Sequence, residues 1–200
     1  MKNGRGRPRG FDTDVALDSA LNVFWKHGFQ STSMTELTKA TGLSKPSLYA
    51  VFGDKGSLYL KALERYASLL IAPHAKKLTE EPNAYLAVEL FLRSLTKMLT
   101  NPNLPGGCFI INGTADFGGG STPKEVETAL TLALQSSEEM IKQRLLQAQR
   151  DGHLPKNIDP QDFCILLCTL IAGLAVKARC GAGEAKLNLA ITATMKAWPS

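Results

Sequence analysis

The sequence predicts an all-α fold in two parts, a small N-terminal three-helix domain and a larger C-terminal helical domain. Apolar residues recur with the period of a helix face, and start and stop signals mark nine helices and no strand of consequence. The 200 residues are 44% apolar and 20% charged, which allows a buried core. The net charge of +5 is uneven, because residues 1–66 hold ten Lys/Arg against six Asp/Glu and the rest hold thirteen against twelve. We therefore expect a flexible basic arm at 1–11, a first domain at 12–54 and a second at 55–200.

The N-terminal helices are expected at 12–27, 34–41 and 45–52. Gly28 is a natural left-handed end for the first helix, and Ser44 is placed to cap the third. Gly42 supplies a tight turn between the second and third helices. The residues of this pair that are spaced to close one shared core are Leu37, Thr41, Leu43, Leu48 and Phe52.

The outward face of the third predicted helix carries short, polar or flat side chains, namely Lys45, Pro46, Ser47, Tyr49 and Ala50. A short helix with such side chains on its outward face, following a tight turn, is typical of a helix that enters a DNA major groove. The positive excess of the first 66 residues fits a domain that faces phosphates, although a basic tail in solvent would give the same count. The pattern therefore predicts a helix-turn-helix DNA-binding domain.

A longer helix is expected to link the two domains, with five more helices in the second. Asp54 is placed to cap the linking helix, and Pro73 is expected to end it. Thr122 reads as the cap of a later helix, with Pro at its first position and Glu125 three residues after the cap. The ranges expected for these helices are 55–72, 88–99, 108–117, 123–150, 160–180 and 184–197.

The predicted helix at 161–179 is apolar nearly all round, so it must be buried on more than one side. One side can face the domain core and the other a second copy of the chain, while a wholly central helix in a monomer is the alternative. Together with the final helix, this pattern predicts an intermolecular four-helix bundle. The residues expected at the dimer interface are Phe163, Leu167, Leu170, Leu174, Leu187, Ile191 and Met195.

The segment from about Asp12 to Tyr66 resembles the N-terminal DNA-binding domain of the TetR family of bacterial transcriptional regulators (TetR/AcrR type). The rest of the chain is similar to that family only in helix count and arrangement. Two positions depart from the pattern, since Thr38 stands where Ala is usual and Gly56 lowers helix propensity at the start of the linking helix. The residues that carry the resemblance are Ala20, Phe24, Gly28, Phe29, Thr32, Leu37, Gly42, Leu43, Ser44, Leu48, Tyr49, Phe52, Asp54, Lys55 and Leu58.

The resemblance implies how the first domain would meet DNA. The third helix would lie in the major groove, with Lys45 on a guanine edge and with Pro46 and Ala50 near a thymine methyl. Hydroxyl groups and Lys55 would contact phosphates. The N-terminal Arg-Gly-Arg-Pro is similar to the core of minor-groove AT-hooks, although an arm without DNA contact is the alternative. The predicted DNA-binding residues are Arg5, Arg7, Arg9, Ser33, Thr35, Ser44, Lys45, Pro46, Ser47, Tyr49, Ala50 and Lys55.

The second domain is expected to hold a pocket for a small-molecule effector, largely apolar with one polar handle. Cys108 would start a helix after two glycines, where backbone N–H groups favour the thiolate and lower the pKa. Some electrophile and oxidant sensors of the resembled family carry a similar Gly-Cys, while a small packing residue is the alternative. The expected pocket residues are Phe91, Leu95, Met98, Cys108, Phe109, Asn112 and Phe117.

Several other classes of function lack support in the sequence. There is no nucleotide fingerprint, and no His lies near Cys108 in the sequence, so we expect neither an enzyme nor a cofactor. Cys164 and Cys168 share a helix face, but no second ligand pair follows at zinc spacing, and no metal site is predicted. No signal peptide is visible, and the apolar run 163–176 is shorter than the roughly 20 residues of a membrane span. We expect a cytoplasmic protein.

These features predict a homodimeric, sequence-specific regulator of transcription. By resemblance it would be a repressor, bound to a palindromic double-stranded DNA operator and released by a small-molecule effector. One alternative is an effector-independent architectural DNA-binding dimer, and another is a variant that senses electrophiles or oxidants through Cys108. A ligand-binding or scaffold protein without DNA is a further alternative.

Overall fold

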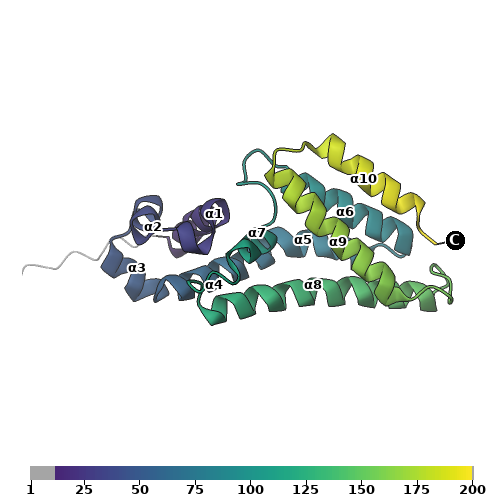
Figure 1. The fold of residues 1–200 in the computed structure, drawn as a ribbon, viewed down its shortest axis with the longest axis horizontal. Helices are drawn as coiled ribbons and strands as arrows, with labels where there is room; N and C mark the ends of the chain where they lie inside the picture. The colour runs from purple at the N-terminus through teal and green to yellow at the C-terminus, as the bar shows by residue number, and fades with distance from the viewer. Residues whose placement is uncertain (1–11, 200) are drawn as a thin grey trace, which may run out of the picture.

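The computed structural model describes residues 12–199, and all the regular structure in that range is helical. Figure 1 shows an elongated molecule in which α1, α2 and α3 form a head at one end and α5, α6, α8, α9 and α10 form a bundle, the body, at the other. A π-helical segment joins α4 to α5, and a short 3-10 helix follows α7. The bounds are α1 Thr13–Ser31, α2 Met34–Thr41, α3 Lys45–Phe52, α4 Lys55–Tyr66, the π segment Ala67–Ile71, α5 Ala72–Glu80, α6 Ala84–Leu99, α7 Phe109–Gly113, the 3-10 helix Thr114–Asp116, α8 Lys124–Arg150, α9 Pro160–Arg179 and α10 Glu184–Lys196.

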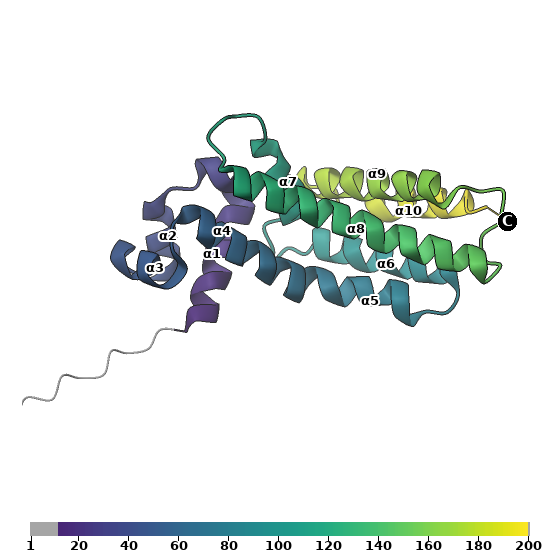
Figure 2. The ribbon, with the colours of Figure 1, turned by 90° about the horizontal axis from the view of Figure 1, so that it is seen from below.

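The helix that leaves the head does not end at Pro73, so that expectation from the sequence was wrong. In Figure 2, α4 and α5 form one continuous rod from the head along the body. Residues 12–199 form ten α-helices, where the sequence predicted nine. Proline lacks an N–H, and its ring meets the carbonyl of the preceding turn. Just before Pro73 the N–H of Ala72 donates to the carbonyl of Ala67, five residues back, and this wider turn accommodates the proline without ending the helix.

Gly28 interrupts α1 as the sequence predicted, but one further turn follows it. Its φ of 80° and ψ of 175° lie inside the range Thr13–Ser31. A residue with a side chain rarely adopts a positive φ of this size, so glycine is required at the break. The last turn of α1 is therefore offset from the rest of the helix.

The predicted helix starts are confirmed at Ser44 and Asp54, whose side chains accept a backbone N–H of the following turn. Asp159 caps α9 in the same way. Thr122 does not cap α8, because Pro123 is the N-cap residue and makes no side-chain cap bond. The Thr122 hydroxyl instead lies between the body and the head. It donates to the Asp116 carbonyl at 3.1 Å and accepts from Gln30 Nε2 at 3.0 Å.

A cluster of aromatic side chains joins the head to the body. Phe109 of α7 has its ring centroid 5.0 Å from that of Tyr59 and 5.5 Å from that of Tyr66, both on α4. Phe24 and Trp25 of α1 pack edge-on against Tyr59 and Tyr66, each at 5.0 Å. All five side chains are buried, so a single core continues from the head into the body.

By length and composition alone, α9 would be able to cross a membrane, since it is 20 residues long rather than the 14 of its central apolar run. Core helices of water-soluble proteins pass the same test. Only 33% of its most apolar stretch is buried within the chain, so much of its apolar surface faces outward. Among the residues described, no other helix has this character.

Candidate DNA-binding head and ligand cavity

The turn at Gly42 sets the angle between α2 and α3. Gly42 has φ 70°, and the Thr41 hydroxyl donates to the Leu37 carbonyl at 2.8 Å and accepts from the Leu43 N–H at 3.3 Å. Leu37 is buried, while Thr41 and Leu43 are partly buried. With Leu48 and Phe52 of α3 also buried, the pair closes the shared core that the sequence predicted.

The opposite face of α3 is open to solvent. Lys45, Pro46, Tyr49 and Ala50 are exposed, with 42% of Tyr49 accessible, and Ser47 is half-buried. The ammonium of Lys45 lies 5.8 Å from the centroid of the Tyr49 ring, within the range of a cation–π contact. A cation beside a flat ring at the N-terminal end of a short exposed helix suits contact with base edges and phosphates.

Three of the predicted hydroxyl groups, those of Ser33, Ser44 and Ser47, take part in helix starts. Ser33 caps α2 in a reciprocal arrangement with Glu36, whose carboxylate accepts from the Ser33 N–H at 2.7 Å and from its hydroxyl at 2.8 Å. The hydroxyls of Ser44 and Ser47 lie 2.8 Å apart at the start of α3. Thr35 is exposed in the first turn of α2. These bonds order both helix N-termini on the surface that would face DNA.

Lys55 differs from a freely solvated lysine. Its ammonium lies 4.4 Å above the Phe29 ring, and the side chain is partly buried. Burial lowers the pKa of Lys55, and the carboxylates of Asp116 and Glu36 act in the opposite direction. Lys55 therefore lies at the junction of α1 and α4, close to the proposed phosphate surface. The predicted contacts at Arg5, Arg7 and Arg9 lie outside the described residues.

The body contains an apolar cavity of about 110 Å³ between α6, α7, α8 and α9. Its one hydroxyl, that of Ser137, donates to the Ala133 carbonyl within α8 at 3.0 Å. Ile71, the last residue of the π segment, forms part of the wall, so the cavity touches the rod that leads to the head. The lining residues are Ile71, Phe91, Leu95, Leu99, Cys108, Ile110, Ile111, Leu134, Ser137, Met140, Ile141, Cys168, Ile171 and Ala172.

Three of the seven expected pocket residues line this cavity, namely Phe91, Leu95 and Cys108. The other four do not line this cavity. Phe109 belongs to the aromatic cluster, Asn112 donates to the Gly106 carbonyl at 3.3 Å, Met98 is buried outside the cavity, and Phe117 is 37% exposed.

The cavity walls from α8 and α9 were missed by the sequence reasoning. Met140, Cys168 and Ile171 belong to apolar stripes that look the same whether they fill a core or line a void. The apolar stripe of α8 includes Leu134 and Ile141, which line the cavity, so this stripe was the one sequence feature that pointed to α8 as a wall.

The Cys108 thiol does not have the lowered pKa expected from its place before a helix. Its side chain is only 7% exposed, and burial raises the pKa of the thiol. The Tyr66 hydroxyl donates to the sulfur at 3.2 Å, and α7 is a single short turn. Cys168 lines the same cavity, and burial raises its pKa to about 12. Both thiols are therefore protonated at neutral pH.

The residues expected at the dimer interface mostly face the chain's own core. Six of the seven are buried within the chain, Phe163, Leu167, Leu174, Leu187, Ile191 and Met195, and Leu170 is partly buried. The outward apolar surface of α9 and α10 is made by different residues. Ile165, Leu166 and Val176 are 52%, 46% and 52% exposed, and Leu189 is 71% exposed. The residues expected from the sequence are therefore not the outward-facing ones of α9 and α10, and the position of the dimer interface stays a prediction.

Comparisons with known proteins agree with this geometry. Residues 16–62 match the family model of bacterial regulatory proteins, tetR family, and residues 84–194 match that of the tetracyclin repressor-like C-terminal domain. The HTH-type transcriptional repressor ComR of Escherichia coli (strain K12) is 34% identical over 202 residues, covering 100% of this chain and 94% of ComR. The HTH-type transcriptional repressor BdcR of the same organism is 32% identical over 109 residues, covering 54% of this chain and 55% of BdcR.

A solved structure has the same fold over nearly the whole length. It is a cysteine mutant of the TetR family transcriptional regulator CifR, complexed with 26bp double-strand operator DNA. The TM-score is 0.91 at 30% identity, covering 97% of this chain and 100% of that chain.

Proposed function

Since this chain belongs to the TetR family of bacterial regulatory proteins and is a DNA-binding transcriptional regulator, we propose that it is a homodimeric repressor that a small apolar effector releases from a palindromic operator. The observation that carries the proposal is the exposed face of α3, held by a buried α2–α3 core. The names of ComR and BdcR as repressors support the direction of regulation. Because bacterial operator DNA lies in the cytoplasm, we place the protein there.

The DNA contacts are proposed for the exposed surface of α2 and α3. Lys45 would reach a guanine edge, while Tyr49 and Thr35 would bind phosphates that fix the register. Ser33, Ser44 and Ser47 would present helix N-termini to the backbone as well as their hydroxyls. Pro46 and Ala50 would contact thymine methyl groups, and Lys55 would hold a phosphate beside Phe29.

The dimer is proposed to form through the outward faces of α9 and α10. Three exposed branched side chains on α9 and Leu189 on α10 leave an apolar surface that a second copy would cover. A two-fold axis would bring the same apolar surface of two copies into contact. A dimer would present two heads to the two half-sites of a palindromic operator.

The effector is proposed to enter the cavity at Cys108. The volume of 110 Å³ is of the order of cavities that accept benzene, about 150 Å³. The only polar lining groups are one hydroxyl already bonded within α8 and two protonated thiols, which favours a small, largely apolar molecule. A ligand pressing on Ile71 would act on the π segment of the rod between body and head. To induce release, it must bind better to the form with low DNA affinity.

The test begins with selection of a binding site for the wild-type protein from random duplex DNA. Lys45→Ala combined with Tyr49→Ala is expected to lower affinity for that site at least about tenfold and to reduce the preference over unrelated DNA. Lys156→Ala, at an exposed lysine in the loop between α8 and α9, is the matched control and should keep full affinity. Wild-type preference in the double variant would reject the assigned surface.

The effector-independent alternative predicts DNA affinity that no small molecule changes. A screen of small apolar compounds for loss of DNA binding separates it from the repressor proposal. The variant that senses oxidants through Cys108 has little support, since burial disfavours the thiolate that such chemistry needs.

A further inference from the structure

The break at Gly28 leaves main-chain groups of α1 without their helical partners. In an unbroken helix the N–H of Gln30 would bind the carbonyl of Lys26. Here the Gln30 N–H donates to the Asp116 carboxylate at 3.2 Å, so the Lys26 carbonyl is open to another donor. The carboxylate of Asp116 therefore accepts the backbone N–H groups that the break in α1 leaves without helical acceptors.

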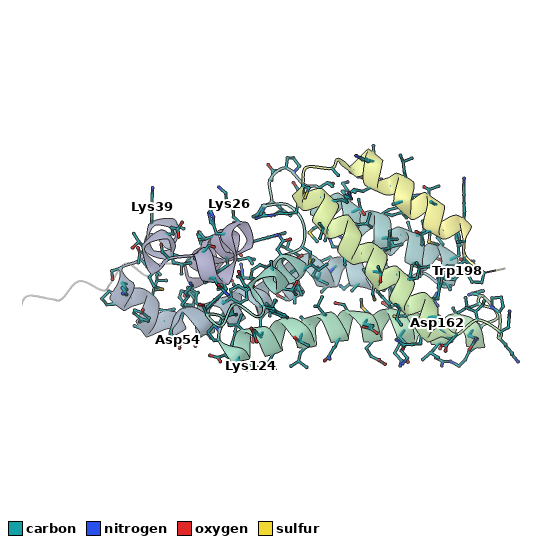
Figure 3. All side chains as sticks on the ribbon, viewed as in Figure 1. Lys26, Lys39, Asp54, Lys124, Asp162 and Trp198 are labelled. Atoms are coloured by element: carbon teal, nitrogen blue, oxygen red, sulfur yellow. The ribbon has the colours of Figure 1, made fainter. Side chains whose placement is uncertain are left out.

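The guanidinium of Arg179 binds the Lys26 carbonyl that the break leaves open. Arg179, at the C-terminal end of α9, donates from Nη2 to the Lys26 carbonyl and from Nη1 to the Pro105 carbonyl at 2.9 Å. Lys26 is labelled on α1 in Figure 3, and Figure 1 shows the loop between α6 and α7 between α1 and the end of α9. Two bonds from one planar, permanently charged group fix orientation as well as distance.

The loop around Gly106 closes the remaining space between α1 and α9. The buried indole of Trp25 donates to the Gly106 carbonyl at 3.1 Å. At Gly107, an added Cβ would lie 2.9 Å from the Ala175 carbonyl oxygen and 3.1 Å from Arg179 Cβ. The loop therefore packs against α9 on one side and holds α1 on the other, without room for a side chain at Gly107.

We propose that Arg179 is a positioning residue that sets the orientation of the DNA-reading head relative to α9. The inference rests on the proposed function, in which α9 forms the dimer interface and two heads read two half-sites. The α4 rod, the aromatic cluster and Asp116 also hold the head, but Arg179 holds it directly from the helix of the proposed dimer interface. Arg179 therefore helps to fix the separation and rotation of the paired heads, and with them the half-site spacing that the dimer accepts.

The experiment compares DNA duplexes that carry the selected site with the spacing between half-sites unchanged or altered by one base pair. One base pair rotates a half-site by about 34° and shifts it along the axis, so a rigid pair of heads discriminates strongly. Arg179→Gln removes the charge and the bidentate geometry, and its discrimination between spacings is expected to fall at least about threefold. Arg179→Lys keeps the charge but can bridge the two carbonyls only poorly, and it should fall between Gln and wild type.

Arg150→Gln is the matched control, because Arg150 ends α8 as Arg179 ends α9 but bonds only to Gln147 of its own helix. It should keep wild-type discrimination. The ratio of affinities within one protein sample does not depend on the folded fraction, so a merely destabilised variant would not change it. Wild-type discrimination in Arg179→Gln, or in Arg179→Lys should the Gln variant fail to fold, overturns the inference. A wild-type protein that selects no site rejects the proposed function and the inference with it.

Discussion

Gln30 donates two hydrogen bonds to Asp116 across the junction of head and body. The backbone N–H of Gln30 donates to the Asp116 carboxylate at 3.2 Å, and the side-chain amide of Gln30 donates to the Asp116 carbonyl at 2.9 Å. The same carboxylate accepts from the Phe29 N–H at 2.7 Å. One acidic residue of the body therefore caps the last turn of α1 beyond Gly28.

Replacing Asp116 with Ala should lower the free energy of unfolding by about 2–3 kcal/mol, because two backbone N–H groups lose a charged acceptor. Urea unfolding followed by circular dichroism measures the change. Asp151→Ala is the control, since Asp151 is exposed and accepts only from Gln147 within its own turn, at 2.7 Å. Its expected loss is below about 1 kcal/mol. Equal losses in the two variants would show that Asp116 has no special part in the junction.

Gly28→Ala should destabilise the protein more than Gly118→Ala does. Both glycines have a positive φ, 80° and 77°, which costs an alanine about 1–2 kcal/mol. At Gly28 the added Cβ would also lie 2.9 Å from the Asp116 carboxylate, whereas at Gly118 it meets no atom within 4 Å. The difference in urea midpoint contains the contact with Asp116 and the backbone strain at Gly28, whose ψ of 175° lies in a region essentially confined to glycine. In the background of Asp116→Ala the part due to the contact is removed, so the difference should shrink, and an unchanged difference contradicts the explanation.

The order and limits of most helices follow from local signals that the sequence displays. The caps at Ser44, Asp54 and Asp159 are side-chain bonds to the next turn, so they need no knowledge of the rest of the fold. The expectation that the helix ends at Pro73 was wrong, because the π segment Ala67–Ile71 accommodates the proline. No pattern in the neighbouring sequence predicts that segment. The expectation that Thr122 caps α8 was wrong, because its hydroxyl accepts a hydrogen bond from Gln30, which is distant in the sequence.

The candidate sites were predicted less completely, for a physical reason. On α3 the spacing of apolar residues predicts the exposed face correctly, because one face packs into a small core and the opposite face is left to solvent. On α9 apolar residues surround the helix, and periodicity does not tell the face that meets the core from the face that meets a partner. The Asp116 and Arg179 contacts join residues more than 80 and 150 positions apart, so no local pattern predicts them.

Leu166→Glu is expected to shift the protein from dimer to monomer. Leu166 is 46% exposed on the outward face of α9, and a charge there would be buried without a partner in the proposed interface. Sedimentation at micromolar concentration measures the change. Leu132→Glu on α8 is the control, because Leu132 is 58% exposed and lies outside the proposed interface. A dimer in both variants, or a monomer in the wild type, contradicts the assigned face.

The four thiols should react with iodoacetamide in an order set by exposure and pKa. Cys180 is exposed and should be alkylated first at pH 7. Burial raises the pKa of Cys108 and raises that of Cys168 to about 12, so their thiolate fractions at pH 7 are very small and grow as the pH rises. Mass mapping after alkylation at pH 7 and pH 9 measures the order. Rapid modification of Cys108 at pH 7 would contradict its buried state and revive the sensor hypothesis.

The cavity at Cys108 should bind a small apolar molecule, and filling it should abolish that binding. Toluene at tenfold its Kd is expected to stabilise the wild-type protein by about 1.4 kcal/mol, seen as a higher Tm, because only the folded state offers the cavity. Ala172→Leu places three further carbons at the cavity wall and should remove the stabilisation. Ala185→Leu, in the exposed first turn of α10, is the control and should keep it. The same shift in all three proteins would mean that toluene binds elsewhere, and no shift in the wild type would mean that the cavity is not a binding site for molecules of this class.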